Sequence, residues 1–264
     1  FFTSTREEGL GNDDIYRFVK RVPPPAPVVE QPKEIEYKLI LKGFVLEKIF
    51  EDPNDPNSRV LGRRPLPGST VRVEIDEETK TFEVGEDGSF SMELDWDTDY
   101  DFRASREDYL TNEAFFSTAG IGRDPNNPVQ TYELEIVLDK IFVDKEIVLE
   151  NIYYDFDKWD IREDAQPTLN DLAEILQLNP EIQIQMGSHT DCRGSNAYNE
   201  DLSQKRAESA VEYLITKGVA RERLTAVGYG ENQPAVDCIC ARCTEEEHQL
   251  NRRTTFKILD ELKN

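Results

Sequence analysis

The chain has 264 residues, which is enough for one large domain or two small ones. Its 54 acidic side chains against 31 Lys and Arg give a net charge of −23. This charge argues against nucleic-acid binding and against electrostatic docking to anionic lipid, because both need basic side chains to meet phosphate groups. No apolar run approaches the ~20 residues of a membrane-spanning helix. Clear hydrophobic periodicity along most of the chain excludes full disorder.

The first 34 residues contain no core of their own. Residues 1–20 predict two short strands around a glycine-containing turn, and residues 21–34 are a proline-rich linker. The first segment resembles the end of a β-propeller repeat at Ser4, Arg6, Gly9, Gly11, Asp13, Asp14, Ile15 and Tyr16. From this resemblance and the abrupt start we expect a fragment of a longer protein with an upstream propeller. A disordered tail is the alternative.

Residues 35–141 predict an all-β sandwich. Apolar and polar residues alternate with turns rich in Gly, Pro and Asp over residues 35–43, 70–75, 80–84, 89–94, 100–104 and 131–138. The motifs at 43–45, 66–71 and 87–90 resemble the carboxypeptidase-regulatory-like, transthyretin-like family, which implies a spacer or binding module. We interpret the acidic segment 51–57 as a turn loop in preference to a calcium site.

Residues 142–264 predict an α/β sandwich with two helices on a mixed four-stranded sheet. Strands are expected at residues 147–154, 181–187, 224–229 and 253–259, and helices at 163–178 and 199–217. Asn179 and Pro180 end the first helix, and Gly218 is expected at the C′ position of the second. The complete chain is therefore predicted to be multidomain.

The most informative polar residues surround the second expected helix. Asp191 follows a strand, and Arg206 lies at the border of the apolar stripe of the helix. A guanidinium group at that border needs an anionic partner or a route to water. One interpretation is a snorkelling arginine or a structural pair with Asp191. The other is a zwitterionic ligand, whose carboxylate would meet Arg206 and whose ammonium would meet Asp191.

Residues 147–259 resemble the OmpA-like peptidoglycan-associated domain family, through the stretches 152–157, 187–194, 198–207, 213–219, 223–234 and 251–253. The resemblance implies non-covalent binding of peptidoglycan through the diaminopimelate of the stem peptide. It assigns the ligand ammonium to Asp191 and the ligand carboxylate to Arg206. It places supporting contacts on Thr190, Asn199, Leu202, Tyr154, Asp155 and Arg252. For Arg252, an ion pair at the flank of the sheet is an equal alternative.

These resemblances imply a cell-wall anchor of an outer-membrane or periplasmic complex, located in the periplasm, with a lipid anchor on the full-length protein. Other envelope proteins are expected as partners, and no cofactor, metal or enzymatic activity is expected. The order of the parts is similar to that of an envelope lipoprotein of the type IX secretion system, so a structural adaptor of a secretion or motility machine is an alternative. A cell-wall hydrolase using His189 and Asp191 is less favoured, because no nucleophile is paired with a base.

The four cysteines have two interpretations. We favour disulfides Cys238–Cys243 and Cys192–Cys240, which fit an oxidising compartment. Zinc held by thiolates together with His248 is the alternative. Three of the cysteines lie in an insertion between residues 234 and 251, which we expect to be a loop at the rim of the site without binding residues of its own. Either cross-link would tie this loop to the ligand pocket.

Overall fold

The computed structural model describes residues 2–4, 14–17, 19–21, 35–75, 78–152, 154 and 158–259. The chain divides into two compact units, Phe1–Glu36 and Tyr37–Asn264. In the first unit, β1 (Phe2–Ser4) and β2 (Asp14–Tyr16) pair antiparallel, as the two expected short strands. The turn between them and the proline-rich residues 22–34 lie outside the described residues, so the propeller ending and the linker stay predictions.

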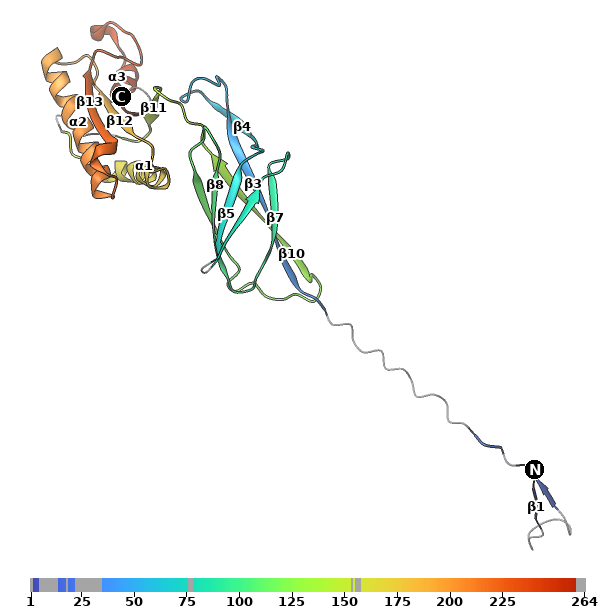
Figure 1. Cartoon of the computed structure of the whole chain (residues 1–264). Helices are drawn as coiled ribbons and strands as arrows, with labels where there is room; N and C mark the ends of the chain where they lie inside the picture. The colour runs from blue at the N-terminus through green and yellow to red at the C-terminus, as the bar shows by residue number, and fades with distance from the viewer. Residues whose placement is uncertain are drawn as a thin grey trace. The chain divides into compact units, whose positions relative to one another are not determined.

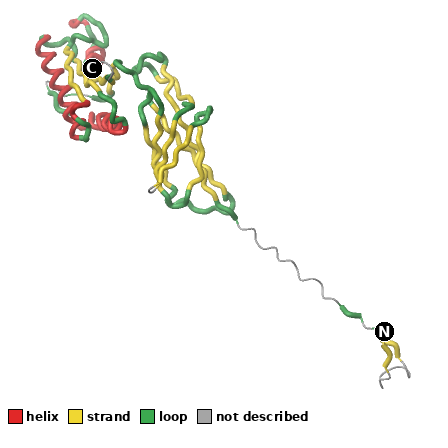
Figure 2. Tube along the Cα trace, viewed as in Figure 1, coloured by secondary structure: helices red, strands yellow, loops and turns green. Residues whose placement is uncertain are grey.

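From Lys38 to Leu138, every described element of secondary structure is a strand. These strands form two four-stranded sheets (Figures 1 and 2). They are β3 (Lys38–Phe50), β4 (Val60–Pro65), β5 (Thr70–Ile75), β6 (Glu78–Glu83), β7 (Ser89–Leu94), β8 (Asp99–Ser105), β9 (Asn112–Ser117) and β10 (Val129–Leu138). One sheet has the order β10-β3-β4, with β7 also paired to β3, and the other has the order β6-β5-β8-β9. The long β3 pairs parallel with β10 and antiparallel with β7 and β4.

Alternate side chains of these strands fill one hydrophobic core, which includes the fully buried Leu39, Leu41, Val71, Val73, Tyr100 and Phe102. All six expected segments form strands. In β3, β5, β7 and β8 the period of two places every second side chain in this core, whereas β6 is mostly exposed. Strands β4 and β9 are not predicted from the sequence, since apolar and polar residues do not alternate cleanly in them; β4 is mostly exposed and β9 is half exposed.

The C-terminal part combines a sheet with helices. Its strands are β11 (Glu146–Leu149), β12 (Ile184–His189), β13 (Leu224–Gly230) and β14 (Thr254–Ile258). Its helices are η1 (Glu163–Ala165), α1 (Gln166–Leu178), α2 (Asn196–Thr216), η2 (Arg221–Arg223), η3 (Cys240–Arg242) and α3 (Glu245–Asn251). The strand order is β11-β14-β12-β13, and only β12 and β13 run parallel. The predicted mixed four-stranded sheet is confirmed.

Buried side chains of α1, α2 and the sheet share a second core, which includes Leu169, Leu176, Ile184, Met186 and Leu214. No helix within the described ranges has both the length and the apolar character to cross a bilayer. Because both this core and the β core lie in the unit Tyr37–Asn264, the boundary expected between residues 141 and 142 stays a prediction.

Several element boundaries differ from the sequence prediction, and three of the differences have a clear physical cause. Helix α2 begins at Asn196, because the Oγ of Ser195 accepts the N–H of Tyr198 and caps the helix. The first strand ends at Leu149, since Asn151 has a φ of 64°, which interrupts an extended backbone. Strand β12 continues to His189 because it pairs with its neighbours on both sides.

The prediction of two α-helices is wrong, because the insertion expected to be a loop contains α3. Thr244 and Glu247 form a capping box: each side chain accepts a hydrogen bond from the backbone N–H of the other residue. The Thr-x-x-Glu spacing of this box is visible in the sequence and could have indicated the helix.

Gly228 allows α2 to approach β13 closely. A Cβ atom at Gly228 would lie 2.2 Å from the backbone nitrogen of Gln204. Gly228→Ala should therefore lower the free energy of unfolding by about 1–3 kcal/mol through overpacking, as measured by urea denaturation. Gly62→Ala is the control, because a Cβ there meets nothing within 4 Å. A similar loss of stability in both variants would contradict this account.

Candidate functional site

A cavity of about 480 Å³ lies where β12 ends and α2 begins. The strands β12 and β14 run antiparallel, with Ser188 opposite Thr254, so the chain just before β14 lies beside the loop just after β12. Backbone hydrogen bonds hold that loop: the N–H of His189 donates to the carbonyl of Arg253, and the N–H of Thr190 donates to that of Gly230. The sheet thus brings Asp191 and Arg252 together from distant parts of the chain.

The carboxylate of Asp191 belongs to a ring of ion pairs, called here the ion-pair ring, which consists of Asp191, Arg193, Glu245 and Arg252. Its Oδ2 lies 2.6 Å from Nη2 of Arg193 and 2.5 Å from Nη1 of Arg252. Both guanidinium groups also contact Glu245, at 3.0 and 2.8 Å. Burial alone would raise the pKa of Asp191, but hydrogen bonds from Arg193 and Arg252 outweigh it and lower the pKa to about 2. Asp191 is therefore ionised at neutral pH.

Arg206 lines the same cavity from α2 and is only 6% exposed. Its guanidinium lies 4.6 Å from the ring centre of Tyr154, and its Nε donates to the carbonyl of Lys158 at 3.0 Å. Within the described part of the chain, Arg206 has no carboxylate at ion-pair distance. Burial lowers its pKa. The interpretation of Arg206 as the structural partner of Asp191 is wrong, because Arg193 and Arg252 take that place.

Three further predicted residues line the cavity: Thr190, Asn199 and Leu202. The side-chain amide of Asn199 donates to the backbone carbonyl of Asp191 at 3.2 Å and to Glu231 at 2.6 Å. Asn199 therefore fixes the backbone that carries the key carboxylate. The Oγ1 of Thr190 is buried and has no hydrogen-bond partner among the described residues.

Tyr154 lines the cavity beside Arg206, and burial raises its pKa. Asp155 lies outside the described residues. Arg252 forms ion pairs with Asp191 and Glu245, as its structural interpretation predicts. It also lines the cavity, and its contact with a ligand stays a prediction.

Sequence reasoning missed part of the cavity lining. Glu245 and Gln249 of α3 line it, which corrects the expectation that the insertion forms only its rim. Arg193 and Arg253 were also missed, although each is adjacent in sequence to a residue or motif already singled out. The Asp-x-Arg spacing at 191 and 193 could have indicated a local ion pair.

The cavity carries an excess of positive charge in a strongly acidic chain. His189, which is 1% exposed, stacks on Tyr229 at 4.8 Å, and burial lowers its pKa to about 3, so it is neutral. Among the described lining residues, the carboxylates of Asp191 and Glu245 face the guanidinium groups of Arg193, Arg206, Arg252 and Arg253. This arrangement suits a small ligand with a carboxylate.

The structure joins Cys192 to Cys240 and Cys238 to Cys243, which is the pairing favoured from the sequence. The Cα atoms lie 5.8 and 5.6 Å apart, within the usual range for disulfides. Cys192 stands between Asp191 and Arg193 in the sequence. The first disulfide therefore ties the loop that carries the ion-pair ring to the insertion that carries α3.

The fold defines an α/β domain with a charged cavity at the end of its mixed sheet. Residues 153–246 match the OmpA family, so this domain is an OmpA family domain, as the sequence resemblance predicts. Outer membrane porin F of Pseudomonas fluorescens is 37% identical over 108 residues, which cover 41% of this chain and 32% of the porin. Peptidoglycan-associated lipoprotein of Buchnera aphidicola is 37% identical over 105 residues, covering 40% of this chain and 58% of the lipoprotein.

The chain thus spans less than two thirds of either of these relatives. Among solved structures, the peptidoglycan-associated lipoprotein from Burkholderia pseudomallei is 31% identical, with a TM-score of 0.38, over 40% of this chain and 87% of that one.

His189 makes stability depend on pH. Its folded pKa of about 3 lies below the 6.5 of the unfolded chain, so the unfolded state binds more protons between these values. The free energy of unfolding should be highest above this range. As the pH is lowered through the range, it should decrease by up to about 1.4 kcal/mol per pH unit. Urea denaturation between about pH 7 and 5, above most carboxyl titration, measures this slope. His189→Gln should flatten it, and an unchanged slope would reject the assignment.

Proposed function

We propose that residues 142–264 bind peptidoglycan non-covalently through the diaminopimelate of the stem peptide and so anchor an envelope complex to the cell wall. The observation that carries this proposal is the buried guanidinium of Arg206, which has no described carboxylate partner and opens onto the same cavity as the ionised Asp191. The end of the diaminopimelate side chain is an α-amino acid, which offers both a carboxylate and an ammonium. The similarity to peptidoglycan-associated lipoproteins supports the proposal.

In this proposal, Arg206 binds the ligand carboxylate with two parallel hydrogen bonds. Stacking on Tyr154 and the bond from Nε to Lys158 hold the guanidinium plane in one orientation before the ligand arrives. Since Nε is engaged, the two terminal nitrogens are the ones that face the ligand. The side chain of Leu202 supplies an apolar wall for the methylene groups of the ligand.

Asp191 receives the ligand ammonium. Its Oδ2 is occupied by two guanidinium groups, whereas Oδ1 accepts the backbone N–H of Arg193 at 3.0 Å and keeps a second lone pair. The hydroxyl of Thr190 and the side chains of Asp155 and Arg252 complete the proposed contacts. Asn199 acts by holding the backbone of Asp191.

The other parts of the chain fit a role in a larger envelope assembly. We propose that residues 35–141 are a carboxypeptidase-regulatory-like module, and that the protein is a periplasmic lipoprotein of the outer membrane. The exposed apolar side chains Val60, Leu61 and Phe115 on β4 and β9 offer contacts to other envelope proteins. A structural adaptor, such as one in a type IX secretion system, is the second candidate function.

The hydrolase hypothesis is weaker. It needs His189 as a base beside Asp191. The imidazole of His189 is buried and stacked on Tyr229, and its low pKa makes it a poor base at neutral pH. The carboxylate of Asp191 is already held by Arg193 and Arg252.

Binding to purified sacculi tests the proposed site. Arg206→Ala and Asp191→Ala should each abolish pull-down, because each leaves a charge of the ligand unpaired in the cavity, at a cost of about 2–5 kcal/mol. Arg221→Ala and Asp201→Ala are matched controls, since both side chains are exposed and form ion pairs away from the cavity. The controls should bind like the unchanged chain. Retained binding in both cavity variants would reject the site.

Arg206→Lys separates charge from geometry. A lysine keeps the positive charge but loses the planar fork that matches a carboxylate, so it should recover only part of the binding lost in Arg206→Ala. Isothermal titration with free diaminopimelate gives the affinities of the three proteins. Full recovery in Arg206→Lys would show that the fork is not used.

A further inference from the structure

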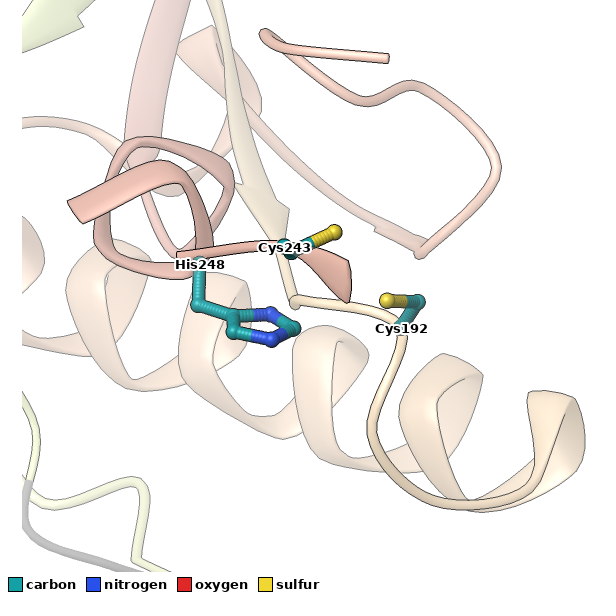
Figure 3. Close-up of side chains that lie close together, drawn as sticks. All are labelled: Cys192, Cys243 and His248. Carbon is teal, nitrogen blue, oxygen red and sulfur yellow. The ribbon is translucent and has the colours of Figure 1, made fainter. Parts of the chain in front are cut away.

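Two disulfides and one imidazole share a single cluster beside the cavity. The Sγ atoms of Cys192 and Cys243 and a nitrogen of His248 lie within 4.8 Å of one another. Figure 3 shows these side chains close together, with Cys192 from the loop after β12 and the other two from the insertion. Cys192 is bonded to Cys240 and Cys243 to Cys238, so each disulfide contributes one sulfur to this cluster.

His248 is the second feature of the cluster. Its side chain is 5% exposed, and its Nδ1 is buried without a hydrogen-bond partner among the described residues. The distance from this Nδ1 to Oδ2 of Asp191 is 3.8 Å, which is too long for a hydrogen bond. A buried imidazole nitrogen normally has a partner, and a metal ion is one of the partners that it can take.

We propose that the reduced form of this chain binds a zinc ion through Cys192, Cys240, Cys243 and His248. Zinc prefers a tetrahedral set of Cys and His ligands, and the Cys-x-x-Cys spacing at 240 and 243 is common in such sets. At Zn–S and Zn–N distances of about 2.3 and 2.0 Å, tetrahedral ligand atoms lie about 3.5–3.8 Å apart. The ligand atoms of Cys192, Cys243 and His248 lie within 4.8 Å of one another, so these three need a contraction of about 1 Å. Cys240 joins the set as the disulfide partner of Cys192.

The change of state balances with a dithiol as reductant. Each disulfide accepts two electrons and two protons and becomes two thiols, while the dithiol becomes a disulfide. Zinc then displaces the protons of the three thiols that it binds as thiolates. The oxidised chain has no thiolate at this cluster, so it does not form this site. In both forms, Cys192 remains joined to the insertion, by a covalent bond or through the metal.

Titration with cobalt, a coloured substitute for zinc, tests the site. The full chain is reduced with dithiothreitol, desalted without oxygen and titrated with Co²⁺. We expect the visible bands of tetrahedral cobalt and a thiolate charge-transfer band, both removed by Zn²⁺. The oxidised chain should show neither. His248→Gln should weaken metal binding by about tenfold or more, whereas Glu246→Gln, an exposed neighbour on α3, should not change it.

The outcomes separate this proposal from others. Absence of tetrahedral bands in the reduced chain, or unchanged affinity in His248→Gln, overturns it. Cys238, Cys243 and Glu247 also lie within 4.8 Å of one another, so a loss in Glu247→Gln alone would move the metal there and overturn the ligand set. Cys240→Ser provides a second variant if His248→Gln does not fold by circular dichroism, and it should show the same loss. None of these results depends on peptidoglycan binding.

Discussion

The pairing of the Asp191 carboxylate with two guanidinium groups is the interaction on which the geometry of the cavity depends. A buried carboxylate is costly unless charged or polar groups surround it. Arg193 comes from the same loop, whereas Arg252 comes from the end of α3, so the pairing joins two segments about 60 residues apart. The antiparallel register of β12 and β14 makes this meeting possible, and the disulfide at Cys192 holds it from the other side.

Arg206 lines the same cavity but takes no part in the ion-pair ring, because other groups contact its guanidinium. It stacks on Tyr154 and bonds to a backbone carbonyl, so its burial is met by groups that do not neutralise its charge. The cavity therefore contains one carboxylate centre that is already paired and one guanidinium whose charge is not neutralised by a described carboxylate. In a chain with a net charge of −23, this local positive excess concerns a single small cavity and does not favour binding to polyanions.

Much of the fold was predictable because burial follows periodicity. The alternation in β5, β7 and β8 placed their residues in the β core, and the apolar stripe of α2 placed Arg206 at the border of the second core. The ion-pair partners of Asp191 were not predictable in the same way, because Arg252 reaches it only through strand register. Strands β4 and β9 lack alternation, and α3 depends on a capping box rather than on an apolar stripe.

The ion-pair ring and the sulfur cluster meet at residues 191–193. Asp191 and Arg193 belong to the ion-pair ring, and Cys192 between them belongs to the sulfur cluster. On the opposite side, α3 repeats the arrangement: Glu245 contacts both arginines, and His248 stands next to the sulfurs while its Nδ1 lies 3.8 Å from Asp191. Since the same two segments supply both the charges and the cross-link, a change in the cross-link must act on residues adjacent to the carboxylate. The cysteines of the insertion are for this reason part of the site and not only a support for a surface loop.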